Sequence, residues 1–418
     1  NQTGQDIWIN IPVKADDDYV LQLAQLLKST LRSDVKVYVE YSNELWNWSF
    51  WQYGTNRDLA TAEVTANPSS TLVYDHTTDT GIMTYRRVAK RGKEISDIFR
   101  SVYGDAAMMS TVRPIFASQI VQPYLSEVGL DFIDAVYGTP SRYFYALAGA
   151  PYYNMGTQQT MDGLSVDQVL AALDASVNSL VSTNYFEKNI ALARRHKLAF
   201  VGYEGGADTF GSGSIAAKKA ASLDPRMLTT CRRYMDTWYA NGGEMMMWFT
   251  AGAGNWDTNY GTWELTTDLS ITNTPKIQCM DQTMAGTLPT LQGRNMVPGT
   301  FNALAFVGST EPYSDAAKTS LRYLHPGSYK DYVVLAPQAG SYALVMTAET
   351  PGTGNSVDVS VNGTVVAAGF EFKPKGWGIK VDNDPIALTL NKGYNAIRIT
   401  TKTEALNQGF SLATLTIQ

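Results

Sequence analysis

Residues 37–48 read Val-Tyr-Val-Glu-Tyr-Ser-Asn-Glu-Leu-Trp-Asn-Trp, an apolar run that ends in an Asn-Glu pair and passes into tryptophans. β-branched and aromatic residues favour a strand, and side-chain alternation places Glu40, Ser42 and Glu44 on one side of it. A carboxylate at the C-terminal end of a strand lies where catalytic groups lie in parallel α/β barrels. Glu44 is therefore a candidate catalytic residue; the alternative is that it caps or pairs with the following helix.

A second stretch has the same form. Residues 198–206 read Leu-Ala-Phe-Val-Gly-Tyr-Glu-Gly-Gly, again an apolar run that ends in one acidic residue, Glu204. The glycines after it either clear space for a ligand or form a tight turn with positive φ. Glu204 is the second candidate carboxylate.

From the N-terminus to residue 286, strand-like runs alternate with amphipathic helical stretches, which predicts repeated β/α units. The predicted strands span residues 6–13, 35–43, 106–113, 132–138, 197–204 and 244–250. We predict a (β/α)8 barrel of the TIM type that lacks two of its eight units in this chain. The missing units are absent, removed, or supplied by an N-terminal fragment or a second chain; an open α/β sheet is the alternative.

The chain changes character after residue 286. Residues 287–298 lack periodicity and contain two prolines, which predicts a linker. Strand-like runs at 332–336, 341–348, 356–361, 386–390 and 396–401 follow, separated by turn residues and without helices. This pattern predicts a jelly-roll-like β-sandwich over residues 299–418.

Composition excludes several classes of function. The net charge is −6 with no basic block, so we expect no nucleic-acid partner. No apolar run approaches the roughly 20 residues that cross a bilayer, so we expect no membrane span. Three histidines and the two cysteines, Cys231 and Cys279, give little support to a metal site, and we expect no catalytic cofactor. The cysteines fit one disulfide or two thiols equally well.

Aromatic residues are frequent, with 24 Tyr and 9 Trp in a chain of which 17% is charged. Flat aromatic faces stack on sugar rings, so this composition is typical of extracellular proteins that handle carbohydrates. We therefore expect a secreted protein that binds a polysaccharide. Because the chain opens at Asn1, we also expect a mature or trimmed product.

Together the two acidic strand ends resemble glycoside hydrolase clan A, retaining (β/α)8 glycosidases with an Asn-Glu acid/base after strand four and a Glu nucleophile after strand seven. Retaining hydrolysis needs two carboxyl groups about 5–5.5 Å apart, one protonated and one ionised. The resemblance covers residues 6–286, here as strands three to eight. It implies that Glu44 is the acid/base, Glu204 the nucleophile, and Asn43 a ligand for a sugar hydroxyl.

The resemblance also implies substrate contacts from aromatic residues. Trp248 ends the predicted last strand, where the clan places the floor of the subsite, and Tyr137 ends the predicted sixth strand, where a tyrosine bonds the nucleophile. Further candidates for stacking on sugar rings lie after strand ends: Trp46, Trp48 and Trp256. Arg113 either replaces an arginine of the clan or, our preferred expectation, neutralises Glu40, which we expect to be structural.

Residues 297–304, 329–334, 361–364 and 393–397 resemble carbohydrate-binding modules of families 6 and 35 in order and spacing. The resemblance implies that Tyr323 and Trp377 form a sugar platform. It also implies a structural calcium near the first strand, but Asn302-Ala303-Leu304 stands where the family has Glu-Ala-Glu, so the acidic pair is lost.

The sequence therefore predicts a retaining endo-β-glycanase, with cellulose or a similar β-glucan favoured as substrate. The alternative is a non-catalytic carbohydrate-binding protein on a degenerate barrel, and the missing strands motivate it. Retention of both Glu44 and Glu204 argues against the alternative.

Overall fold

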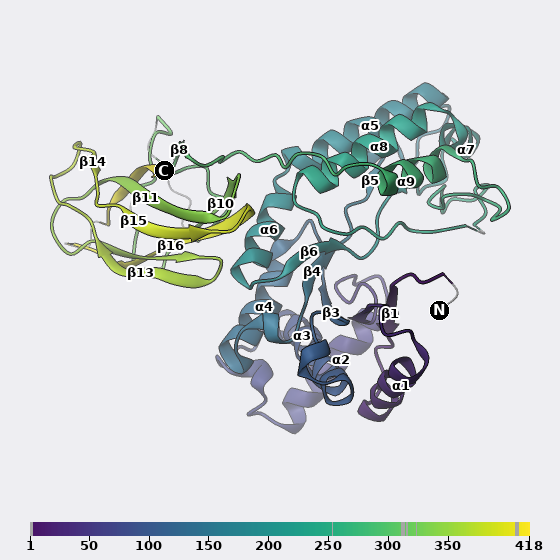
Figure 1. Cartoon of the computed structure of the whole chain (residues 1–418), viewed down its shortest axis with the longest axis horizontal. Coiled ribbons are helices and arrows are strands. Elements are labelled where there is room, and N and C mark those ends of the chain that lie inside the picture. The colour runs from purple at the N-terminus through teal and green to yellow at the C-terminus, as the bar shows by residue number, and fades with distance from the viewer. Residues whose placement is uncertain (1–2, 253, 311–313, 315–316, 323, 406–408) are drawn as a thin grey trace. The chain divides into compact units, whose positions relative to one another are not determined.

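Five strands form a parallel sheet in the first of two compact units of the chain (Figure 1). The structure is a computed structural model that describes residues 3–418 apart from 253, 311–313, 315–316, 323 and 406–408. In order across the sheet the strands are β1 (Ile7–Ile11), β2 (Val37–Tyr41), β3 (Val112–Ala117), β4 (Ala146–Gly149) and β6 (Ala199–Gly202). Every residue of β2 is buried, as expected for a parallel strand covered on both faces.

A sixth segment continues this order, because Met246 forms a parallel bridge with Gly202. Within the part of the chain that the structure describes, β1 pairs with β2 alone, so the sheet has an edge there. The consecutive parallel order is the one predicted for strands three to eight of a barrel. An eight-stranded barrel itself stays a prediction.

Helices follow the strands as the β/α repeat predicts. They are α1 (Asp17–Thr30), α2 (Trp51–Ala66), α3 (Thr80–Tyr103), α4 (Pro123–Tyr137), α5 (Val166–Ser182), α6 (Tyr185–Arg195), α7 (Ile215–Leu223), α8 (Arg226–Ala240) and α9 (Pro275–Ala285). Short 3-10 turns lie at Thr71–Val73, Asp105–Ala107, Pro140–Arg142 and Gly156–Gln158, and β5 (Tyr153–Asn154) pairs with β7 (Ala207–Asp208). None of the described helices is both long and apolar enough to cross a bilayer.

The predicted strand at 132–138 is wrong, because these residues complete helix α4. Pro123 begins this helix, and Leu130 and Ile133 are buried on its inner face at helical spacing. The strand that takes this place in the sheet is β4, and the strand expected at 106–113 is shifted to Val112–Ala117. At 244–250, the bridge at Met246 replaces the predicted strand.

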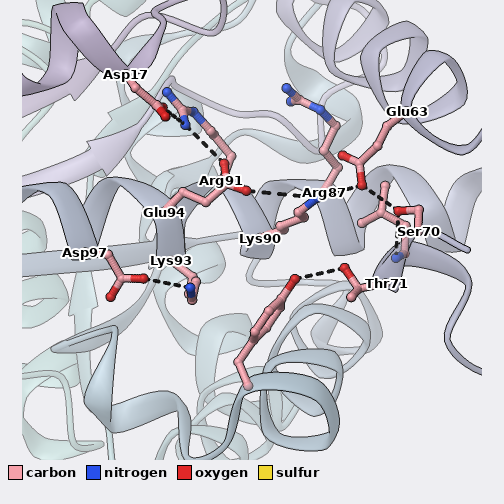
Figure 2. Close-up of polar contacts among 12 residues, drawn as sticks. Asp17, Glu63, Ser70, Thr71, Arg87, Lys90, Arg91, Lys93, Glu94 and Asp97 are labelled. Atoms are coloured by element: carbon pink, nitrogen blue, oxygen red, sulfur yellow. Dashed lines mark hydrogen bonds and ion pairs between the residues drawn. The ribbon is translucent and has the colours of Figure 1, made fainter. Parts of the chain in front are cut away.

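Ion pairs tie helix α3 to its neighbours (Figure 2). Arg91 pairs with Asp17 of α1 at 2.6 Å, and Lys90 pairs with Glu63 of α2 at 2.6 Å. Both pairs keep one or more partly exposed partners, so each contributes on the order of 1 kcal/mol. Their common effect is to fix the helices that carry the loops after β1 and β2.

The second unit contains two antiparallel sheets packed face to face, the β-sandwich that the sequence predicts (Figure 1). One sheet holds β13 (Thr364–Glu371), β12 (Ser356–Val361), β16 (Gly393–Thr403), β10 (Tyr329–Ala336) and β9 (Gly308–Ser309). The other holds β14 (Val381–Asp382), β11 (Gly340–Glu349), β17 (Ser411–Ile417) and β8 (Gly299–Asn302), with β15 (Ile386–Leu390) paired to β11. Inward-facing Leu, Ile and Val side chains form the core between them.

This second unit also includes residues 177–197 and 232–242, which the expected boundary at residue 286 places with the barrel. Helix α6 packs against β16 and β10. Arg294 pairs with Glu187 of α6 at 2.5 Å, and the hydroxyl of Tyr394 donates to the carbonyl of Ala240 at 2.9 Å. The sandwich therefore carries a helical layer that precedes it in the sequence.

Cys231 of α8 and Cys279 of α9 form a disulfide and are fully buried. The bond closes a loop of 48 residues, and the entropy it removes from the unfolded chain corresponds to about 4 kcal/mol. We expect Cys231→Ser/Cys279→Ser to unfold at clearly lower urea concentration than the wild type, which equilibrium unfolding by circular dichroism measures. Wild type treated with a reductant is the control, and an unchanged midpoint in the double variant would contradict the prediction.

Candidate functional site

Glu44 lies in the turn that follows β2. Ser42 and Glu44 both have left-handed backbones, with φ of 60° and 46°. Such conformations are unfavourable for residues with a Cβ, by about 1–2 kcal/mol each, and persist where surrounding contacts hold them. Asn10 supplies one such contact, because its amide donates to the carbonyl of Ser42 at 2.5 Å. The strained turn aims the side chain of Glu44 at the end of the sheet.

Glu204 lies at the end of β6, beyond two intervening strands of the same sheet. A side-chain hydrogen bond joins Glu44 and Glu204. The hydroxyl of Tyr203 also reaches across and donates to Glu44 Oε1 at 3.3 Å. The structure thus brings together the two carboxyl groups that the sequence selected.

The two glycines after Glu204 make room for an aromatic ring. A Cβ on Gly206, whose φ is 128°, would lie 2.7 Å from the ring of Trp248. The positive φ of Gly206 confirms the tight-turn interpretation, and the ring of Trp248 fills the space that its missing side chain leaves. Trp248 is half-buried beside the site, and its Nε1 donates to the carbonyl of Trp263 at 3.0 Å.

Neutral hydrogen-bond donors surround both carboxyl groups. Asn47 Nδ2 donates to Glu44 Oε2 at 2.8 Å, and Trp46 Nε1 donates to the Tyr203 hydroxyl at 3.2 Å. Asn43 and Tyr152 donate to Glu204. The predicted site residues Asn43 and Trp46 therefore lie at the carboxyl pair.

Burial raises the pKa of Glu204 to about 8, and the adjacent Glu44 adds to the rise through its charge and its hydrogen bond. The hydrogen bonds from Tyr152 and Asn43 act in the opposite direction. The raised pKa keeps a proton on Glu204 at pH values below about 8. Retaining glycoside hydrolysis requires one protonated and one ionised carboxyl group, and the ionised one is the nucleophile.

Tyr152 is the tyrosine that bonds Glu204, and the prediction of Tyr137 for this role is wrong. Tyr137 ends helix α4, and its hydroxyl lies 2.8 Å from that of Thr71. Tyr152 follows β4, and burial together with the charge of Glu204 raises the pKa of its hydroxyl well above the usual range. Only the position of β4, which the sequence does not predict, singles out Tyr152.

Glu40 lies deeper in the sheet than Glu44 and is 2% exposed. Its Oε2 accepts from Trp8 Nε1 at 2.8 Å and from Asn10 Nδ2 at 3.0 Å. The expected neutralisation by Arg113 is wrong, because this guanidinium donates to the hydroxyl of Tyr38 at 2.6 Å and stacks on Tyr145. Burial raises the pKa of Glu40 to about 8, so the side chain is protonated at neutral pH.

This shift predicts a pH dependence of stability. The folded chain holds the Glu40 proton up to pH of about 8, whereas the unfolded chain releases it near 4.5, so unfolding releases a proton between these values. The contribution of protonated Glu40 to the free energy of unfolding is therefore fully present below pH 4.5. It falls as the pH rises above that value and is lost once the pH passes about 8. We expect Glu40→Gln to remove this loss and to exceed the wild type in stability above pH 8 by a few kcal/mol.

Urea unfolding of the wild type and Glu40→Gln at several pH values measures this difference. Gln is the matched replacement because it keeps the shape of the neutral acid. Parallel stability curves for the two proteins from pH 4 to pH 9 would contradict the protonated state of Glu40.

Two of the remaining predicted aromatic contacts differ sharply in their surroundings. Trp48 is 81% exposed just beyond Glu44, so it is free to stack on a ligand. Trp256 is 2% exposed, its Nε1 donates to Glu264 Oε2 at 2.7 Å, and the Lys276 ammonium lies 4.9 Å from its ring centre. The predicted substrate contact of Trp256 is therefore wrong, because the ring is part of the core.

In the second unit, Trp377 is 41% exposed in the segment between β13 and β14. Tyr323, its predicted partner in a sugar platform, lies outside the described residues. Asn302 Oδ1 accepts from the amide of Leu304 at 2.8 Å, so its side chain closes a turn. Without the acidic pair and with this amide engaged, these residues do not fit the calcium site of the family.

No family model and no curated protein matches this chain. Among solved structures, it is similar to a family 35 carbohydrate-binding module from Paenibacillus barcinonensis, at 18% identity over 29% of this chain and 98% of the module, with a TM-score of 0.23. A family 6 module from the Cellvibrio mixtus lichenase 5A, in complex with cellotriose, has 19% identity over 29% of this chain and 98% of its own, with a TM-score of 0.25. The C-terminal family 6 module of LamC from Zobellia galactanivorans has 15% identity over 29% of this chain and 99% of the module, with a TM-score of 0.24.

Proposed function

We propose that this chain is a secreted retaining β-glycosidase that hydrolyses a β-linked polysaccharide, with Glu44 as acid/base and Glu204 as nucleophile. The observation that carries the proposal is the hydrogen-bonded pair of these two carboxyl groups at the C-terminal end of a parallel sheet. Retaining enzymes keep their two carboxyl groups about 5–5.5 Å apart and inverting enzymes roughly 6.5–9.5 Å, so a pair in direct hydrogen-bond contact favours the retaining class. The disulfide between Cys231 and Cys279 supports secretion into an oxidising compartment.

The reaction begins when a sugar ring enters and separates the two carboxyl groups. As the pair separates, the proton of Glu204 passes to Glu44, and Tyr152 and Asn43 stabilise the carboxylate left on Glu204. A Glu204 carboxylate oxygen attacks the anomeric carbon and the glycosidic C–O bond breaks. Glu44 gives its proton to the leaving oxygen.

The second step reverses these roles. Glu44, now ionised, takes a proton from a water molecule, and the water oxygen attacks the anomeric carbon. The bond to Glu204 breaks, and its electron pair returns to the carboxylate. Two inversions at one carbon leave the sugar with its original configuration.

A panel of soluble β-glycans tests the proposal. We expect the wild type to release reducing ends from at least one of carboxymethylcellulose, mixed-linkage β-glucan, xylan, mannan and agarose, with a β-glucan favoured. Boiled protein is the control. If the wild type hydrolyses none of these polymers, the proposal is wrong.

The second candidate is a non-catalytic carbohydrate-binding protein. The edge of the sheet at β1 favours it, because two further strands would have to pair there to complete a barrel. Those strands would come from an N-terminal fragment or a second chain, and the carboxyl pair would then be unchanged. Retarded migration in gels that contain the polymers, without hydrolysis of any, would favour this candidate.

A further inference from the structure

Five aromatic rings form a continuous series that starts at the carboxyl pair and ends at the surface of the first unit. We call this series, made of Tyr152, Phe249, Trp263, Phe210 and Tyr260, the aromatic wall. Its first member donates a hydrogen bond to Glu204. Its last two members are exposed, Phe210 at 43% and Tyr260 at 62%.

Ring contacts join each member of the aromatic wall to the next. The rings of Tyr152 and Phe249 meet edge to face at 6.5 Å, and those of Phe249 and Trp263 at 5.5 Å. Trp263 and Phe210 are nearly parallel, with 9° between their planes at 6.5 Å. Tyr260 closes the series at 6.4 Å from Trp263. The rings therefore support one another and keep a fixed surface.

A carboxylate lies against this surface. Trp263 Nε1 donates to Asp208 Oδ1 at 2.9 Å, and Gln159 approaches Asp208 Oδ2 at 3.5 Å. The charge of Asp208 also acts on Tyr152, the first ring of the wall. An aromatic face bordered by a fixed acceptor matches a pyranose ring, which has an apolar C–H face and hydroxyl donors around its rim.

Core packing does not account for the outer rings. A packed core would bury Phe210 and Tyr260, whereas exposed neighbouring aromatic side chains mark a binding surface. The segments that carry them, after β7 and around residue 260, lie outside the strands of the parallel sheet, and the wall starts at Glu204.

We propose that the aromatic wall binds a run of β-linked sugar units that extends from the bond being cleaved, so that the substrate is a polysaccharide chain and not a short glycoside. This inference rests on the proposed function, because it takes the carboxyl pair as the place of cleavage. The wall provides affinity along the chain, and Glu44 and Glu204 carry out the chemistry at its inner end.

The test is the variant Phe210→Ala/Tyr260→Ala, in which only exposed rings are lost, so the fold is expected to persist. For the polymer that the wild type hydrolyses, we expect the KM to rise at least about tenfold, the effect of losing binding contacts worth more than 1 kcal/mol. The value of kcat/KM for the p-nitrophenyl glycoside of the same sugar stays unchanged. Tyr74→Ala, which removes another exposed tyrosine, is the matched control and leaves both values unchanged. An unchanged polymer KM in the wall variant overturns the inference, as does an equal loss on both substrates.

Binding separates failure of this inference from failure of the proposed function. Isothermal titration with cellohexaose, laminarihexaose, xylohexaose and mannohexaose applies even where no polymer is hydrolysed. If the wild type binds one hexasaccharide and the wall variant binds it at least about tenfold more weakly, the aromatic wall is a sugar-binding site even where the chain hydrolyses no polymer. If the wall variant keeps the wild-type affinity, or if the wild type binds none of the four, the wall is not a sugar site.

Discussion

Glu204→Ala is expected to lower kcat on the polymer substrate by at least about 10⁴-fold, the scale on which loss of a nucleophile disables a concerted site. The carboxylate that forms the covalent bond is absent in this variant, and Tyr152 and Asn43 are left to face a cavity. Reducing-end release under substrate saturation measures the loss. Glu94→Ala, which removes a half-exposed carboxylate from α3, is the control and keeps wild-type activity.

Rescue by azide distinguishes a missing nucleophile from a damaged fold. Azide that enters the space left by Glu204 attacks the anomeric carbon from that side, with one inversion, so the product is an α-glycosyl azide. The variant is expected to be at least as stable as the wild type near neutral pH, since it removes a carboxyl group whose pKa burial and Glu44 raise. Glu204→Ala with more than a tenth of wild-type activity would contradict the assignment.

Glu44→Ala is expected to lower kcat/KM on the polymer by about 10²–10⁴-fold, the usual contribution of general acid catalysis. A polymer leaves as a poor alkoxide that needs the proton of Glu44, whereas a dinitrophenolate leaves without one. The first step on a 2,4-dinitrophenyl glycoside is therefore nearly unaffected, and a burst of dinitrophenol precedes slow turnover. Pre-steady-state absorbance measures the burst.

Azide again identifies the missing group. With Glu44 removed, azide takes the place of the activated water and attacks the glycosyl enzyme, and the second inversion gives a β-glycosyl azide. The two variants should thus give azides of opposite configuration. An equal loss of activity on polymer and dinitrophenyl glycoside, without a burst, would exclude Glu44 as the acid/base.

The sequence predicts much of both units because the relevant strands carry strong local signals. β2 and β6 are runs that are followed within three residues by Glu44 and Glu204, and the parallel order of one sheet places both carboxyl groups at the same edge. In the sandwich, β12 and β15 have the predicted bounds because buried Val, Ile and Leu alternate with more exposed residues between turns. At these positions, local propensity and tertiary burial agree.

The errors arise where that agreement fails. β4 reads Ala-Leu-Ala-Gly, without a β-branched residue, so nothing local favours a strand; its neighbours in the sheet decide it. Phe132 to Val136 has strand-like composition but completes the apolar face of α4. Because the sequence predicts the strand at 132–138 and not at β4, it assigns the role of the tyrosine that bonds Glu204 to Tyr137 instead of Tyr152.

Side-chain surroundings are the second thing that the sequence leaves open. Trp48 and Trp256 both follow predicted strand ends, yet one is exposed and the other is buried over Lys276. Phe210 and Tyr260 lie 50 residues apart in loops of no obvious pattern, and only the fold places them in one wall. Contacts between distant segments decide each of these cases.

The most direct test of the retaining mechanism at Glu44 and Glu204 is the configuration of the first product. Proton NMR that follows hydrolysis of the substrate polymer from its first minutes resolves the α and β anomers of the new reducing end before they equilibrate. The carboxyl pair predicts that the β anomer forms first and the α anomer accumulates later by mutarotation. Initial release of the α anomer would mean single displacement by water and would contradict the account.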